Sequence, residues 1–133
     1  MERDKFEDLV VEAADNLPEE FGDRLDNVEL VVEDLPSKSQ VRKMRLRDPL
    51  QLLGLYEGIP QTERGTGYTM VLPDKITLYQ KSIETACRYS GRSVREEVED
   101  VLKHEIAHHF GIGDGRLAEI EREKRRNRGR KPR

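Results

Sequence analysis

Residues 104–114 read His104-Glu105-Ile106-Ala107-His108-His109-Phe110-Gly111-Ile112-Gly113-Asp114. The chain has three histidines, and all of them lie in this stretch. Residues four apart on an α-helix lie on the same face, so the imidazoles of His104 and His108 can converge on one metal ion. The pattern H-E-x-x-H is typical of two zinc ligands and a general base on one helix. The stretch therefore predicts a Zn²⁺ site.

Glu105 is the predicted general base of this site. It is rotated by about 100° from His104 around the helix, so it can reach a metal-bound water without being a ligand. Zinc lowers the pKa of such a water from 15.7 toward roughly 7, which makes a nucleophile at neutral pH. Glu105 would take the water proton and later deliver it to a leaving amine.

A third protein ligand is expected, because two histidines and a water leave a tetrahedral zinc one ligand short. Gly111 can take the left-handed conformation that ends a helix. Asp114 is the first ionisable side chain after that turn, and we predict it as the third ligand. The alternative is that Asp114 caps a last helix beginning near Gly115, since Asp is a favoured N-cap residue.

The helix that carries the motif can be predicted independently of the histidines. Residues 93–96, Ser-Val-Arg-Glu, fit a capping box that starts a helix. Apolar residues then recur at helical spacing, at Val94, Val98, Val101, Leu102 and Ile106. His104, Glu105 and His108 fall at the edge of this apolar stripe, where one flank is packed and the other is open.

Two further reactive side chains are expected to be structural. His109 lies about 100° around the helix from His108, toward the apolar stripe, so we expect a partly buried packing or hydrogen-bonding residue. Cys87 is the only cysteine, which excludes an intrachain disulfide and a cysteine-cluster zinc site. Its helical spacing with Ile83 and Ala86 predicts a small core residue.

Length and charge indicate one domain over residues 1–123 and a basic, disordered tail over residues 124–133. The chain has 133 residues, with 38% charged residues and a net charge of −3, and no apolar run is long enough to span a bilayer. The N-terminus lacks a signal-peptide pattern, so we expect a cytoplasmic protein. The tail has no acidic residue; it is expected to be solvated or, alternatively, to contact nucleic acid.

Hydrophobic periodicity predicts an α+β fold, with helices packed against one short mixed sheet. An amphipathic first helix runs from about Phe6 to Leu17 and ends near Pro18. Strands are expected at residues 28–33, 52–59 and 75–79. Helices are expected at about residues 82–89, in the motif segment, and at 115–126. The basic stretch from Lys38 to Arg47 is expected to be a surface loop.

The motif resembles the minimal zincins, a family of small bacterial zincin-like metallopeptidase domains with an H-E-x-x-H-x-x-G-x-x-D pattern. The resemblance extends upstream to residues 52–60, 62–64 and 72–79, and it covers about half the chain. It implies a compact zincin core, with a short sheet, an active-site helix and a turn carrying the last ligand. A metzincin would have a third histidine in place of Asp114 and a later methionine turn. All three methionines precede the motif, which excludes that class.

Several details of the site stay open at this level. Glu119 is the alternative third ligand. In zincins an edge strand aligns the peptide substrate, and either strand 52–59 or strand 75–79 could serve. An oxyanion stabiliser is also needed. The candidate side chains are Tyr56, Arg64, Tyr68 and Tyr79, and each of them is expected to be structural.

The favoured function is a zinc-dependent metallopeptidase acting on peptides or proteins. One alternative is a non-catalytic zinc-binding regulatory or interaction module. A weaker alternative is a nucleic-acid-associated protein acting through its basic tail. A membrane partner is not expected, and the sequence does not indicate an oligomeric state.

Overall fold

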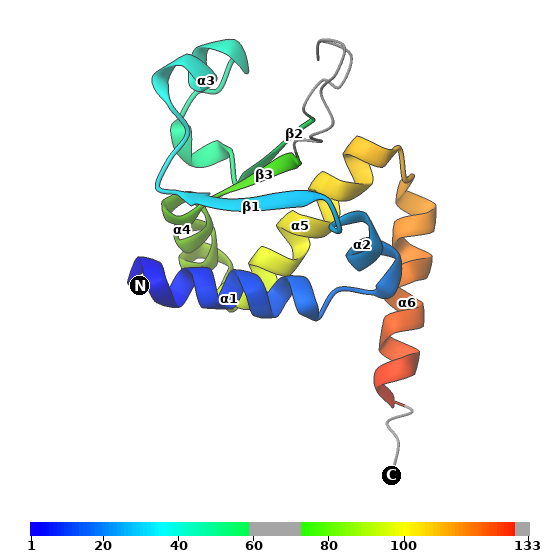
Figure 1. Cartoon of the computed structure of the whole chain (residues 1–133). Helices are drawn as coiled ribbons and strands as arrows, with labels where there is room; N and C mark the ends of the chain where they lie inside the picture. The colour runs from blue at the N-terminus through cyan, green and yellow to red at the C-terminus, as the bar shows by residue number, and fades with distance from the viewer. Residues whose placement is uncertain (59–72, 130–133) are drawn as a thin grey trace, which may run out of the picture.

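A computed structural model of the chain describes residues 1–58 and 73–129. Within the last helix it describes the backbone, but not the side chains of Asp114, Leu117, Lys124 and residues 127–129. The elements in chain order are α1 (Arg3–Asp15), α2 (Glu19–Arg24), β1 (Val28–Glu33), α3 (Lys38–Lys43), the 3-10 helix η1 (Pro49–Gln51), β2 (Gly54–Glu57), β3 (Asp74–Tyr79), α4 (Gln80–Ser90), α5 (Val94–Phe110) and α6 (Asp114–Gly129). Helices α1, α4 and α5 lie on one side of the sheet, and α3 lies on the other (Figure 1).

The three strands form one mixed sheet in the order β1-β3-β2. Strand β1 pairs parallel to β3, with Leu30 opposite Ile76, and β2 pairs antiparallel to β3, with Tyr56 opposite Ile76. The predicted α+β class with a mixed sheet is confirmed. The pairing also decides between the two candidate edge strands, because β3 is bonded on both sides and β2 lies at an edge.

Helix α5 is the centre of the packing. It contacts α1, α2 and α4 and also lies against β2 and β3. Its buried residues Val98, Leu102 and Ile106 belong to one core cluster with apolar side chains from α1, α2, β3, α4 and α6, namely Phe6, Val10, Phe21, Leu78, Ile83 and Ile120. Cys87 is buried in this core, as predicted. The core thus fixes the inner face of α5 and leaves its opposite edge for chemistry.

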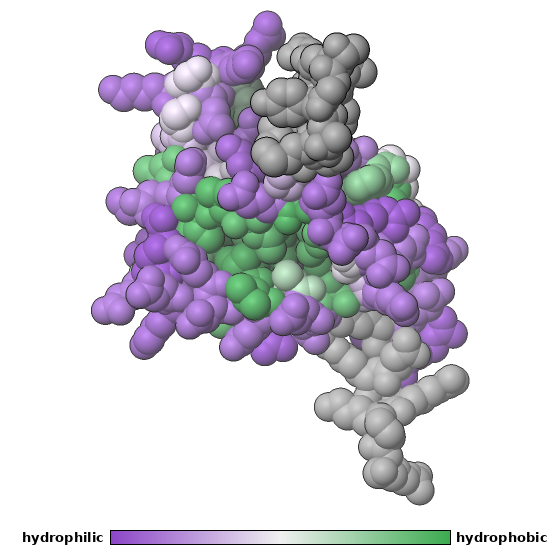
Figure 2. All heavy atoms as spheres, viewed as in Figure 1, coloured by the Kyte–Doolittle hydropathy of each residue, from purple (hydrophilic) through white to green (hydrophobic). Residues whose placement is uncertain are grey.

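The surface seen in Figure 2 is mostly hydrophilic, with a hydrophobic patch over β1 and the adjoining side of α1. Strand β1 is the other edge of the sheet, and the Arg3 guanidinium donates to the Val32 carbonyl, 2.9 Å away. A charged side chain on a sheet edge hinders pairing with another strand. Within residues 1–58 and 73–129, no helix is both long enough and apolar enough to cross a membrane.

The structure corrects four expectations about the helices and strands. The expected loop from Lys38 to Arg47 is wrong for its first part, because α3 forms there on a capping box in which Ser37 and Gln40 bond each other's backbone N–H. Strand β2 is shorter than expected and is preceded by η1. The short helix α2 was not predicted. Helix α6 begins at Asp114 and continues to Gly129, so its backbone includes part of the stretch expected to be a tail.

Candidate metal centre

Helix α5 has the two ends that the sequence predicts. The Ser93 hydroxyl accepts from the Glu96 backbone N–H at 3.1 Å, and the Glu96 carboxylate accepts from the Ser93 N–H at 3.2 Å. At the other end Gly111 has φ +69°, and the Ile112 N–H donates to the Ala107 carbonyl at 2.8 Å. This is the pattern of a left-handed helix cap. The motif therefore lies on the last two turns of a helix with defined ends.

The structure places His104 and His108 on the exposed edge of α5. The Nδ1 atom of His104 lies 2.8 Å from the backbone carbonyl oxygen of Asp100. A carbonyl oxygen only accepts, so Nδ1 carries the proton and the lone pair is on Nε2. Histidine ligands of metals commonly hold their second ring nitrogen in this way, which fixes the ring and the tautomer. The His104 imidazole is thus prepared to donate Nε2 to a metal.

Glu105 follows His104 on α5 and is half-buried. Its Oε1 atom accepts from the backbone N–H of Tyr56 on β2, at 3.0 Å. Burial raises the pKa of the Glu105 carboxyl above its usual range, and the Tyr56 N–H and the two histidines oppose that rise. A carboxylate with a raised pKa is a better proton acceptor at neutral pH. The sequence predicted the role of Glu105 but not its anchor on β2.

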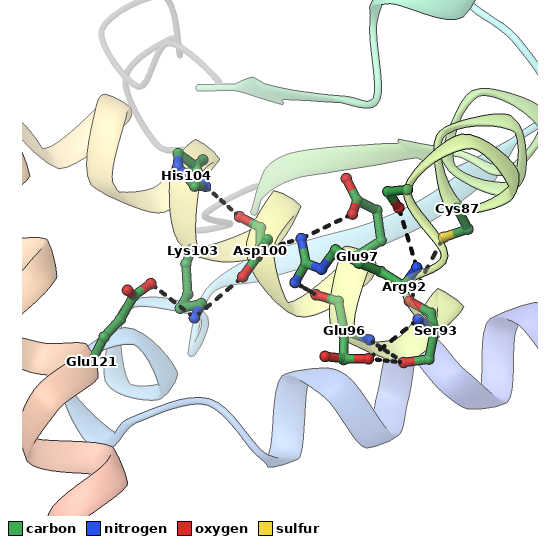
Figure 3. A network of polar contacts seen from close by, with 10 residues as sticks. Cys87, Arg92, Ser93, Glu96, Glu97, Asp100, Lys103, His104 and Glu121 are labelled. Carbon is green, nitrogen blue, oxygen red and sulfur yellow. Dashed lines mark hydrogen bonds and ion pairs between the residues drawn. The ribbon is translucent and has the colours of Figure 1, made fainter.

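A cleft of about 440 Å³ opens beside His104 and Glu105. One part of its lining is apolar, with Leu52, Leu53 and Val101. Another part is charged, with Arg92, Glu97 and Asp100. The Arg92 guanidinium bonds Asp100 at 2.6 Å and Glu97 at 3.1 Å, and Figure 3 shows it between the two carboxylates. The cleft therefore offers apolar and charged walls to a ligand held next to Glu105.

Gly54 allows β2 to approach α5 at this cleft. A Cβ atom at position 54 would lie 2.5 Å from Val101 Cγ1, 3.2 Å from the Thr77 carbonyl oxygen and 3.7 Å from Glu105 Cγ. A glycine inside a strand can mark a site of close approach, and Gly54 lies inside the strand expected at residues 52–59.

An aromatic cluster borders the other end of the site. The Tyr56 ring stacks on His109 with centroids 3.8 Å apart, and the Phe110 ring meets both of them edge-on. His109 packs as predicted but is exposed rather than partly buried, because its partner is the Tyr56 ring and not the core. The Tyr56 hydroxyl donates to Asp74 at 2.8 Å.

Tyr56 and Tyr79, two of the four side chains considered as oxyanion stabilisers, have structural partners. Burial, followed by the Asp74 contact, raises the pKa of Tyr56. Tyr79 is fully buried, and its hydroxyl donates to Gln40 at 3.1 Å. Arg64 and Tyr68 lie outside the described residues, so their expected roles stay predictions.

The third ligand also stays a prediction. Helix α6 begins at Asp114, and the Asp114 side chain lies outside those that the structure describes. Glu119 is exposed and pairs with Arg116 at 3.2 Å. Among the described side chains, no group of three or more His, Cys, Asp or Glu residues is arranged to hold a metal ion. The described part of the site therefore consists of His104, Glu105 and His108.

Comparison with known families decides the classification. A profile of the zincin-like metallopeptidases matches residues 25–124, which include all three strands and the whole of α5. The chain belongs to the zincin-like metallopeptidase family. No curated protein sequence gives a significant match. The zincin-like family binds zinc, and the nitrogen donor of His104 with its fixed tautomer fits that metal.

Proposed function

We propose that this protein is a zinc-dependent peptidase, with His104, His108 and Asp114 as metal ligands and Glu105 as general base. One observation carries the proposal. Glu105 lines a cleft together with His104, and its carboxylate is held by the backbone of an edge strand. A base is thereby fixed beside both a candidate metal ligand and a strand that can bind a peptide.

The protein's own residues supply orientation and proton transfer. Zinc, when bound, lowers the pKa of its water and polarises the substrate carbonyl. Asp100 holds the His104 ring through its carbonyl. The Tyr56 N–H holds the Glu105 carboxylate, which accepts a proton from the attacking water and passes it to the leaving amine.

Strand β2 is the proposed binding site for the substrate backbone. The Tyr79 N–H donates to the Leu53 carbonyl, so Leu53 faces β3, and Gly54 and Tyr56 present their backbone groups to the outer edge by strand alternation. The bond from the Tyr56 N–H to Glu105 agrees with this assignment. Because Glu105 already holds the Tyr56 N–H, an extended peptide added at this edge would pair with the backbone of Gly54 and the carbonyl of Tyr56, and it would pass Glu105.

The test is cleavage of a diverse peptide library by the zinc-loaded protein. Wild type should produce specific cleavages, Glu105→Gln should abolish them while retaining zinc, and the exposed strand variant Glu29→Gln should behave as wild type. Retention of zinc without cleavage by wild type would refute the peptidase and favour the non-catalytic zinc-binding module. Cleavage by Glu105→Gln at the wild-type rate would remove Glu105 from the mechanism.

A further inference from the structure

Lys103 joins α5 to α6 through a nearly buried ammonium group. Its side chain is 11% exposed, and its Nζ atom lies 3.1 Å from the Glu121 carboxylate on α6 and 3.4 Å from the Asp100 carboxylate. Figure 3 shows Lys103 extending between these two partners, with Arg92 on the far side of Asp100. Burial of a lysine is unfavourable unless the charge is paired. The two carboxylates supply that pairing.

The described side chains of α6 make few other connections to the domain. Among the described elements, the pairs whose backbones pack most closely do not include α6. The distal half of α6 extends away from the body (Figure 1). Ile120 enters the core, and Arg116 pairs with Glu20 on α2 at 2.8 Å, where both side chains are substantially exposed. The Lys103–Glu121 pair is the less exposed of these two ion pairs, and it lies next to Ile120.

Helix geometry links this pair to the start of α6. Glu121 follows Asp114 by seven residues. Seven residues fall about 20° short of two full helical turns and advance along the axis by about 10 Å. The Cα atoms of Asp114 and Glu121 therefore share one face of α6, and Glu121 shows that this face turns toward α5. The backbone position of Asp114 relative to His108 then depends on where Glu121 is held.

We propose that Lys103 and Glu121 are positioning residues for the third metal ligand. The ion pair fixes the rotation and height of α6 against α5, and the first residue of α6 is thereby held near the end of the motif helix. This inference rests on the proposed metal site but not on peptidase activity. Neither Lys103 nor Glu121 contacts the metal in this account; both act through Asp114.

The test measures zinc affinity by competition with a chromophoric chelator. Glu121→Ala should weaken zinc binding by about tenfold to a hundredfold, the range for residues that support metal ligands. Lys103 keeps Asp100 as a partner in this variant, so the fold should be retained. Glu123→Ala is the matched control, because Glu123 lies on the same helix and, among the described side chains, its only ion pair is with Arg116, at 3.7 Å. Its affinity should equal that of wild type.

A second pair of variants separates positioning from general destabilisation. Lys103→Met should weaken zinc binding as Glu121→Ala does, and Lys103→Arg should restore it by keeping the charge. In an Asp114→Ala background, Glu121→Ala should cause no further loss, because the ligand that it positions is gone. Unchanged affinity in Glu121→Ala, or an equal loss with and without Asp114, would overturn the inference. Because no substrate is used, failure of the peptidase proposal would leave this result unaffected.

Discussion

Replacing Gly54 by alanine tests the close approach of β2 to α5. The new Cβ would lie 2.5 Å from Val101 Cγ1, whereas apolar carbons pack at about 3.5–4.0 Å. The strand and the helix must therefore separate by about 1 Å, or Val101 must leave its position. Overpacking of this kind typically lowers stability by about 1–3 kcal/mol. We expect a loss in that range for Gly54→Ala.

The same displacement should reduce catalysis. The Tyr56 N–H lies 3.0 Å from the Glu105 carboxylate, and an added 1 Å would take the pair beyond hydrogen-bond distance of about 3.5 Å. Misplacement of a catalytic group by about 1 Å can lower a rate about 100-fold. Zinc binding should change less, because His104 is oriented by Asp100 within α5.

Urea denaturation and peptide cleavage measure the two effects. Gly22→Ala is the matched control, since a Cβ there meets no atom within 4 Å and an alanine should stabilise α2 by about 0.5–1 kcal/mol. Val101→Ala should partly rescue Gly54→Ala by removing the clashing methyl, although the Thr77 carbonyl remains 3.2 Å away. If the effects of Gly54→Ala and Val101→Ala simply add, the clash is not the cause and the reasoning fails.

Three further predictions concern single residues. Metal-free Glu105→Gln should be more stable than wild type at pH 7 but not at pH 4. Folding raises the pKa of the Glu105 carboxyl, so the stability that the neutral carboxyl gives wild type below the unfolded pKa is lost as pH rises through the folded pKa. Equal urea midpoints for the two proteins at both pH values would contradict this. Gly111→Ala should lower stability by about 1–2 kcal/mol through strain alone, because φ is +69° and no atom lies within 4 Å of the new Cβ; an unchanged urea midpoint would disprove the left-handed cap. Burial raises the pKa of the Cys87 thiol, so a thiol reagent at pH 8 should label it far more slowly in native than in urea-unfolded protein, and equal rates would contradict its place in the core.

The sequence was sufficient for the motif helix because its signals are local. A capping box at Ser93, an apolar stripe and a glycine at position 111 each act within one or two turns, and all three form as expected. The alternating strand at residues 28–33 was predictable for the same reason. Local signals were present for α3 as well, in Ser37 and Gln40, but the segment lacks the apolar periodicity that would have indicated a helix.

Features that depend on contacts between distant segments could not be predicted. The Tyr56 N–H meets Glu105 across 49 positions of sequence, and Lys103 meets Glu121 across 18. No spacing in the sequence marks Tyr56 as the partner of Glu105, or Glu121 as the partner of Lys103. Gly54 is a partial exception, because a glycine in a strand can signal close approach, although the sequence does not name Val101 as the neighbour. The edge position of β2 likewise became clear only from the pairing of β3.

Zinc stoichiometry in histidine variants tests the central claim most directly. Native mass spectrometry after zinc loading and desalting should find one zinc per chain in wild type, and none in His104→Gln or His108→Gln. His109→Gln is the matched control on the same helix, because His109 stacks on Tyr56, and it should retain one zinc. Absence of zinc from wild type, or retention of one zinc in both His104→Gln and His108→Gln, would contradict the assignment of this site.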